Sequence, residues 1–280
     1  MILRFRNVLL TGAAGGIGRA VYHALRERGA RVLITGRDPS ALQEMIDDMP
    51  GEGEAYCAAD LTDAADRRRL CELAMRWHGG IDVLINNAGV SDLALLHSQS
   101  VESLERTLAT NLLAPMDLCR QLVPHLQQRN YAQIVNIGSV FGSIGYPGYT
   151  VYCASKFALR GFSEALRREL ADTSVHVHYL APRATQTAIN SPAAQAMSAA
   201  LGVATDPPEV VATAVVEMLQ QGRTQRVLGW PEKFFAFING VLPGMVDGAL
   251  RKQLPTIRGH ADPASSLNRQ LAADGGRSNP

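Results

Sequence analysis

The sequence contains no run of about 18 apolar residues, the length that a membrane-spanning helix requires, so we predict no transmembrane segment. Blocks of like charge are also absent and the formal net charge is only +1, which argues against nucleic acid as a partner. Four widely spaced cysteines form neither a C-x-x-C pair nor a metal-ligand pattern: Cys57, Cys71, Cys119 and Cys153. We therefore predict reduced core thiols, no metal site and a cytoplasmic location.

The sequence does contain an alternation of apolar runs and helical patterns. The first apolar run, Asn7–Leu10, leads into TGAAGGIG at Thr11–Gly18, and a helical apolar stripe then runs from Ile17 until Gly29 stops it. Strand, glycine turn and helix in this order favour a pyrophosphate site, because glycines allow close backbone approach and the helix N-terminus attracts the anion. A glycine-rich turn without a ligand is the less favoured alternative.

The glycine spacing fits two patterns. Gly12, Gly16 and Gly18 match T-G-x-x-x-G-x-G, whereas Gly12, Gly15 and Gly18 match T-G-x-x-G-x-x-G. The sequence leaves both open, and we predict that all four glycines, together with Ile17, bind a dinucleotide cofactor.

The end of the second predicted strand, Arg31–Thr35, bears on the choice of cofactor. An acidic residue there would bind the ribose 2′-hydroxyl of NAD(H), whereas an arginine suits the 2′-phosphate of NADP(H). Gly36 stands where the acid is expected and Arg37 follows, although Asp38 comes next. The pattern favours NADP(H) over NAD(H), and a solvated arginine that opens a loop is the alternative.

Two further strands are followed by residues that suit a cofactor site. The strand near Glu54–Ala58 leads to Asp60 and Leu61, and Asp60 could accept a hydrogen bond from an adenine amino group or cap a helix. The apolar strand Ile81–Ile85 ends in NNAG at Asn86–Gly89, where the asparagine amides could tie the turn together. We predict cofactor contacts from the last three of these residues: Asn87, Ala88 and Gly89.

The stretch after the strand Gln133–Gly138 carries the candidate chemistry. If Tyr152 opens a helix, Lys156 lies one turn later on the same face, and a nearby cation would lower the pKa of the phenol below its usual value of about 10. Such a phenol could act as a general acid near neutral pH. Ser139 lies at the strand end, thirteen residues before the tyrosine. Taken alone, the Tyr-x-x-x-Lys spacing of Tyr152 and Lys156 would more often arise by chance.

These motifs occur in the order found in the short-chain dehydrogenase/reductase family, and the resemblance covers roughly residues 7–230. NNAG and the chain length resemble its compact, single-domain branch. The resemblance implies a Rossmann-type, doubly wound parallel α/β sheet of about seven strands with helices on both faces. It also implies that Tyr152 is the general acid/base, that Lys156 contacts the nicotinamide ribose, that Ser139 holds the substrate carbonyl, and that Asn111 interrupts a helix and holds a water linked to Lys156.

After the strand Val175–Leu180, the family's Pro-Gly-x-x-x-Thr pattern is only partly kept. Pro182 and Thr187 match and are predicted cofactor contacts, but Arg183 replaces the glycine. We suggest that Arg183 faces a phosphate or an acidic group of the substrate.

We divide the chain into a dinucleotide-binding and catalytic domain at 1–230, a helical extension packed on it at 231–259, and a disordered tail at 260–280. Residues 188–205 suit a lid over the substrate or an ordinary surface helix.

The extension keeps an apolar helical stripe that allows three interpretations: a wall of the substrate pocket, an oligomer contact, or a membrane-surface helix over 234–250. The flanking cations Lys233, Arg251 and Lys252 are few for a membrane contact, and we favour the first two interpretations.

Taken together, the sequence predicts an NADP(H)-dependent oxidoreductase that reduces a carbonyl, or oxidises a secondary alcohol, on a lipophilic or acyl-like small molecule. By resemblance, helices near Asn111–Gln128 and Tyr152–Ala171 would build a homodimer or homotetramer. The alternatives are a sugar-nucleotide epimerase or dehydratase of the extended type and a non-catalytic cofactor-sensing protein, although such proteins usually lose the tyrosine or the lysine.

Overall fold

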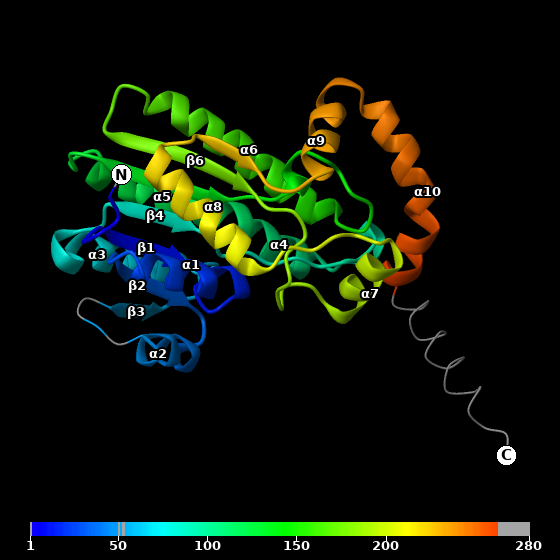
Figure 1. Ribbon diagram of the computed structural model, residues 1–280. Coiled ribbons are helices and arrows are strands. Elements are labelled where there is room, and N and C mark those ends of the chain that lie inside the picture. The colour runs from blue at the N-terminus through cyan, green and yellow to red at the C-terminus, as the bar shows by residue number, and fades with distance from the viewer. Residues whose placement is uncertain (1, 50, 52–53, 263–280) are drawn as a thin grey trace, which may run out of the picture.

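The computed structural model describes residues 2–49, 51 and 54–262, and its centre is a parallel sheet of seven strands in the order β3-β2-β1-β4-β5-β6-β7 (Figure 1). The strands are β1 Asn7–Thr11, β2 Arg31–Gly36, β3 Ala55–Ala58, β4 Val83–Asn86, β5 Ala132–Ile137, β6 Val175–Ala181 and β7 Gln225–Val227. The chain winds outward from β1 in one direction and from β4 in the other, and the predicted doubly wound fold is confirmed.

Helices cover both faces of this sheet. They are α1 Gly16–Arg26, α2 Pro39–Asp47, α3 Ala64–Arg76, α4 Val101–Leu108, α5 Ala114–Leu126, α6 Thr150–Glu169, α7 Pro192–Ala200, α8 Pro208–Gln221, α9 Glu232–Val241 and α10 Pro243–Ala261. Three short 3-10 turns lie at Trp77–Gly79, Leu96–Ser98 and Val140–Gly142. In the part of the chain that the structure describes, no helix has the length and apolar character needed to cross a bilayer.

Successive side chains of β1 point to opposite faces of the sheet, and both faces are buried, which explains why the apolar runs in the sequence are continuous. Val8 and Leu10 pack into the core beneath α1, α2 and α8, whereas Leu9 packs into the core beneath α3, α5 and α6. All five residues of the strand are buried. A parallel strand with helices on both faces must be apolar on both sides, so its sequence shows no polar alternation.

The helix over residues 101–126 is interrupted rather than divided in two. α4 passes through a π-helical turn at Ala109–Leu113 directly into α5. Pro115 lacks an N–H group and therefore cannot donate the usual i+4 hydrogen bond to the carbonyl of Asn111. The predicted interruption at Asn111 is confirmed, and its form is a π turn, a feature that often marks functional sites.

The C-terminal helices lie together at one end of the molecule (Figure 1). α10 packs against both α7 and α9. The apolar stripe of the extension is divided at Pro243, because α9 ends at Val241 and α10 begins at Pro243. α10 extends through Ala261, past the predicted start of the tail, and residues 263–280 lie outside the described residues.

Candidate active site

The parallel register of the central strands brings the predicted site residues to one edge of the sheet. Leu10 pairs with Ile85, and Asn86 pairs with Asn136, so that β1, β4 and β5 end side by side. The segments that follow these strands therefore share the carboxyl edge, where ligands bind in open α/β sheets.

Tyr152 and Lys156 lie in the first two turns of α6, which begins at Thr150 and not at Tyr152 itself. The Lys156 ammonium lies 5.7 Å from the centroid of the Tyr152 ring and donates a 3.1 Å hydrogen bond to the carbonyl of Ile137, the last residue of β5. Ser139 follows two residues later, and its hydroxyl accepts a hydrogen bond from the amide of Phe141 at 3.1 Å. The structure therefore brings together the three predicted groups.

Burial decides the protonation of this pair. Removal of Tyr152 from water raises the pKa of its phenol above the ordinary value, and a hydrogen bond from Ser139 lowers it by less. The same desolvation lowers the pKa of Lys156 to about 8. This direction is opposite to the predicted lowering, because desolvation is the largest cause and the Lys156 ammonium, 5.7 Å from the ring centroid, is not among the groups that lower this pKa. The phenol therefore carries its proton at neutral pH.

The depressed pKa of Lys156 predicts a pH-dependent cost to stability. Between about pH 8 and its unfolded value near 10.5, the unfolded chain binds this proton and the folded chain does not, so stability rises with pH. Lys156→Met removes the titration, and its stability advantage over the wild type should shrink by about 2 kcal/mol between about pH 7 and pH 9.5. Urea unfolding of both proteins measures this; an advantage that grows with pH would contradict the buried-ammonium assignment.

Asn111 is buried at the centre of a small polar network. Its side-chain oxygen accepts from the amide of Val90 at 2.8 Å, and its side-chain nitrogen donates to the carbonyl of Val90 at 2.9 Å and to the hydroxyl of Ser155 at 3.1 Å. Ser155 in turn donates to the carbonyl of Tyr152 at 2.7 Å. The π turn is therefore fixed both to the loop after β4 and to α6. Ser155 matches no motif in the sequence and was not predicted.

The glycine turn after β1 distinguishes the two spacings. Gly12 has a φ of +63°, and a Cβ atom on Gly18 would lie 2.2 Å from the Gly12 carbonyl oxygen. A Cβ atom on Gly16 would lie 2.7 Å from the methyl carbon of Thr187, whereas one on Gly15 would meet only an ordinary contact at 3.4 Å. The close approaches require glycine at positions 12, 16 and 18, which is the T-G-x-x-x-G-x-G pattern.

The start of α1 fits a phosphate. Gly15 precedes the helix and provides no side-chain cap; its own amide donates to the carbonyl of Gly12 at 3.2 Å, and its carbonyl accepts from the amide of Arg19 at 2.8 Å. The amides of 16–18 therefore open the helix without a side-chain acceptor from its cap, the arrangement in which helix N-termini hold anions. Ile17 is half-buried against the core beneath α1.

The NNAG segment ties two strand ends together, as predicted. The side-chain nitrogen of Asn87 donates to the carbonyls of Thr11 and Gly12, each at 3.0 Å. The amides of Asn87 and Ala88 both donate to the hydroxyl of Thr11 at 3.0 Å. Thr11 is thus a positioning residue that the glycine pattern contained but did not single out. Gly89 lies close to Lys156: a Cβ atom on Gly89 would be 3.6 Å from the ammonium nitrogen. A larger side chain at this position would therefore fill the space beside Lys156.

Arg37 and its neighbours occupy the carboxyl ends of β2 and β3. The Asp38 carboxylate caps α2 by accepting from the amide of Ser40 at 2.9 Å. Arg37 is exposed and makes no hydrogen bond or ion pair with any residue that the structure describes. Hydrogen bonds from Thr62 lower the pKa of Asp60, and the charge of Arg37 lowers it further, so the two strand ends are close.

Asp60 and Leu61 differ in what they can offer. Asp60 is exposed, and it does not cap α3, because that role belongs to Asp63. The alternative interpretation of Asp60 as a helix cap is therefore wrong. The side chain of Leu61 is buried in the core beneath α3, so only its backbone can face a cofactor.

The segment after β6 reaches back over the glycine turn through Thr187, and Pro182 joins it to β5 by accepting from the amide of Val140 at 2.9 Å. Arg183 does not face the site. Its guanidinium pairs with Asp206 at 2.6 Å and Glu232 at 3.5 Å, and its side chain is 17 % exposed. The suggestion that Arg183 binds an acidic substrate group is wrong, because the protein's own carboxylates occupy it.

These contacts predict that Arg183 contributes to stability. Arg183→Ala leaves two largely buried carboxylates without their cation, and we expect a loss of about 2 kcal/mol in the free energy of unfolding. The matched control is Arg226→Ala, which breaks the more exposed pair with Glu217 and should cost less than about 1 kcal/mol. Urea denaturation measures both, and equal losses would contradict this role.

An apolar cluster surrounds Tyr152. Its buried members come from α6 and the residue before it, from α7 and from α10: Tyr149, Cys153, Ala194, Met197 and Ile257. Tyr146 joins it and donates to the side chain of Gln253 on α10 at 3.0 Å. The extension and the segment predicted as a lid thus pack beside Tyr152.

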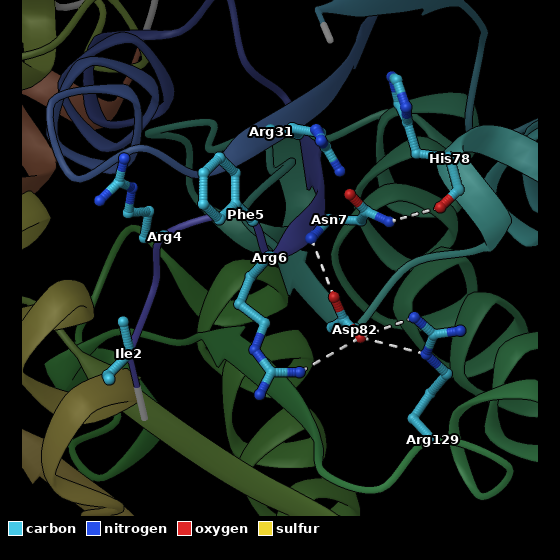
Figure 2. A pocket seen from close by; sticks show the side chains of 9 residues that line it. All are labelled: Ile2, Arg4, Phe5, Arg6, Asn7, Arg31, His78, Asp82 and Arg129. Atoms are coloured by element: carbon cyan, nitrogen blue, oxygen red, sulfur yellow. Dashed lines mark hydrogen bonds and ion pairs between the residues drawn. The ribbon is translucent and has the colours of Figure 1, made fainter.

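A hollow of about 430 Å³ lies elsewhere, among the amino ends of the strands (Figure 2). Asn7 and Arg31 open β1 and β2 there, and Asp82 precedes β4. Arg129 and Arg6 both pair with Asp82, at 3.0 and 3.5 Å. We interpret this hollow as a structural cluster, because Arg6 and Arg129 already pair with Asp82 and the hollow lies opposite the carboxyl edge. Among the described residues, no group of three or more His, Cys, Asp or Glu side chains is placed to hold a metal.

Comparisons with known proteins agree with this geometry. The family model for short chain dehydrogenases matches residues 6–198. The chain is 32% identical over 226 residues to the ketoacyl reductase HetN of Nostoc sp., covering 80% of this chain and 78% of the relative. It is 33% identical over 179 residues to the 3-oxoacyl-[acyl-carrier-protein] reductase FabG of Escherichia coli, covering 64% and 73%.

Solved structures share the fold. A short-chain dehydrogenase from Sphingobium yanoikuyae in complex with NADPH has a TM-score of 0.74 at 25% identity, over 87% of this chain and 96% of that one. A short chain dehydrogenase/reductase from Burkholderia phymatum in complex with NAD has a TM-score of 0.80 at 21% identity, over 88% and 96%. With its seven-stranded sheet, this chain belongs to the short-chain dehydrogenase/reductase family of oxidoreductases.

Proposed function

We propose that this protein is an NADP(H)-dependent reductase of carbonyl groups on lipophilic or acyl-like small molecules. The observation that carries the proposal is the grouping of Tyr152, Ser139 and Lys156 at the sheet edge where the glycine turn fits a dinucleotide.

Each residue has one task in the proposed reaction. The Tyr152 phenol gives its proton to the substrate oxygen as negative charge develops there. The Ser139 hydroxyl donates a hydrogen bond to the same oxygen, and Lys156 holds the nicotinamide ribose. NADPH, when bound, supplies the hydride. The raised pKa of Tyr152 keeps the phenol protonated at neutral pH, which is the state that a proton donor needs.

The Asn111 carbonyl is proposed to hold a water that links Lys156 to solvent. Pro115 withholds the donor that would otherwise occupy this carbonyl in a regular helix. The side-chain bonds of Asn111 to Val90 and Ser155 keep the π turn beside Lys156.

Arg37 supports NADP(H). It is exposed and has no partner among the described residues, while the carboxylate of Asp38 is turned away to cap α2. Asp60 and the backbone of Leu61 are proposed to border the adenine. The NADPH complex of the Sphingobium yanoikuyae relative supports this choice, whereas the NAD complex of the Burkholderia phymatum protein shows that the fold itself accepts both cofactors.

The apolar cluster supports the substrate class. Met197 of α7 and Ile257 of α10 lie with Tyr152 in one hydrophobic group, which suits an acyl chain better than a sugar. HetN and FabG are named as reductases of ketoacyl compounds, which supports the same class.

A homo-oligomer is proposed through α5 and α6, where large apolar side chains are exposed: Leu113 just before α5 (51 %), Met116 of α5 (39 %) and Phe157 of α6 (42 %). All four cysteines are buried and unpaired, which supports a cytoplasmic location.

Oxidation of NADPH in the presence of a panel of carbonyl compounds tests the proposal. The panel should pair β-ketoacyl thioesters and medium-chain ketones with short polar ketones of equal reactivity. We expect turnover that increases with acyl chain length and that is slower with NADH. The proposed activity is wrong if NADPH binds to the protein and no carbonyl of the panel is reduced.

A further inference from the structure

The beginning of the C-terminal extension exposes a dense group of large apolar side chains, which we call the α9 surface. Figure 1 shows α9 and α10 at one end of the molecule, beyond the sheet. The structure buries no residue of α9. The members of the α9 surface and their exposed fractions are Trp230 69 %, Phe234 48 %, Phe235 41 %, Phe237 67 %, Val241 62 %, Leu242 52 % and Met245 66 %.

The opposite side of the same helices is fixed to the protein. Val246 and Ile257 of α10 are buried, and the side chain of Asn239 donates to the carbonyl of Ser143 at 2.9 Å. Gln253 accepts from Tyr146. The α9 surface is therefore the outer face of a helical pair that packs on the rest of the protein. The residues that hold this pair in place are different from those of the α9 surface.

The charges around this surface are unevenly distributed. From residue 233 to residue 246 the sequence has one ionisable side chain, Lys233. The preceding carboxylate, Glu232, pairs with Arg183. Arg251 and Lys252 follow in α10, while Asp247 is the only acid between them and Lys233. The surface thus combines tryptophan and phenylalanine with a modest excess of cations, which is typical of segments that lie in the interface of an anionic bilayer.

A second copy of the chain is the competing occupant. The exposed apolar residues of α5 and α6 already offer a face for oligomerisation, and they lie on elements distinct from α9. The α9 surface differs from that face in its aromatic content, because it contains Trp230 and three phenylalanines. One acid, Asp247, lies near it against three cations. We propose that the α9 surface docks on a membrane containing anionic lipids, with Trp230, Phe234 and Phe237 entering the interfacial layer. The weak excess of cations argued against this contact in the sequence, and the exposure of seven apolar side chains outweighs it.

Vesicle flotation of the full chain tests this directly and does not depend on any enzymatic activity. We expect the wild type to float with vesicles of phosphatidylcholine and phosphatidylglycerol in equal parts, and less with phosphatidylcholine alone. The variant Phe234→Ser/Phe237→Ser/Leu242→Ser should lose about tenfold or more of its vesicle affinity. Neutralisation by Lys233→Gln/Arg251→Gln/Lys252→Gln should remove the preference for phosphatidylglycerol.

The matched control replaces three exposed apolar residues elsewhere: Ile2→Ser/Phe5→Ser/Val210→Ser. It should float like the wild type, and circular dichroism and thermal unfolding confirm that each variant is folded. A wild type that does not float with either vesicle, or a triple α9 variant that floats equally well, overturns the proposal. If light scattering shows instead that the α9 variant dissociates an oligomer while the wild type ignores vesicles, the surface belongs to a second copy and the proposal is likewise wrong.

Discussion

Tyr152→Phe is expected to reduce kcat for NADPH-dependent carbonyl reduction by about 10²- to 10⁴-fold, the range that a positioned general acid contributes. The substitution removes only the phenolic oxygen, so the ring keeps its place beside Phe141 and Tyr149. Binding of NADPH, measured by fluorescence titration, should change little. Retention of more than a few per cent of activity would exclude Tyr152 as the proton donor.

Tyr149→Phe is the matched control for this experiment. Tyr149 lies one helical turn away, with its ring centroid 6.2 Å from that of Tyr152, and it is buried in the same apolar cluster. Burial raises the pKa of both phenols, so a raised pKa alone does not mark the catalytic group. Only Tyr152 has both the Ser139 hydroxyl and the Lys156 ammonium beside it. We therefore expect the control to keep kcat within about threefold of the wild type, far above the loss expected for a general acid.

The sequence was sufficient for the fold and for the position of the site, because both depend on local patterns. Parallel strands buried on two faces require continuous apolar runs, and the residues after each run must meet at one edge. Asn87 and Ser139 follow from that rule without any knowledge of side-chain contacts, whereas Thr11 was identified only by its hydrogen bonds. The glycine turn left two spacings open, and only the approach of Thr187 to Gly16 distinguished them.

Properties that depend on burial or on distant partners could not be predicted in this way. The sign of the Tyr152 pKa shift is set by how much water the surrounding helices exclude, and α10 supplies part of that exclusion from residues about a hundred positions later. Arg183 seemed available for a substrate because its carboxylate partners, Asp206 and Glu232, lie 23 and 49 residues away in the chain. Interactions of this kind leave no periodic signal in the sequence.

Arg37→Asp is expected to change the cofactor preference. A charged hydrogen bond from Arg37 to the 2′-phosphate contributes about 1.5 to 3 kcal/mol, so its loss should reduce kcat/KM for NADPH by about 10- to 100-fold. The introduced carboxylate would repel the phosphate and could accept from the 2′-hydroxyl of NADH, whose kcat/KM should stay equal or rise. Asp38 cannot take this part in the wild type, because it caps α2.

The ratio of kcat/KM for NADPH to kcat/KM for NADH separates a change in cofactor preference from a general loss of activity. Arg37→Ala should lower kcat/KM for NADPH without improving NADH, and Arg28→Asp, an equal charge change in the turn before β2, should alter neither value. Higher salt should weaken NADPH binding to the wild type more than to Arg37→Asp, because screening acts on the arginine–phosphate attraction. An unchanged NADPH-to-NADH ratio in Arg37→Asp would show that the 2′-phosphate lies elsewhere. The exposure of Arg37 and the engagement of Asp38 would then carry no information about the cofactor, and the choice between NADP(H) and NAD(H) would have to rest on groups outside this strand end.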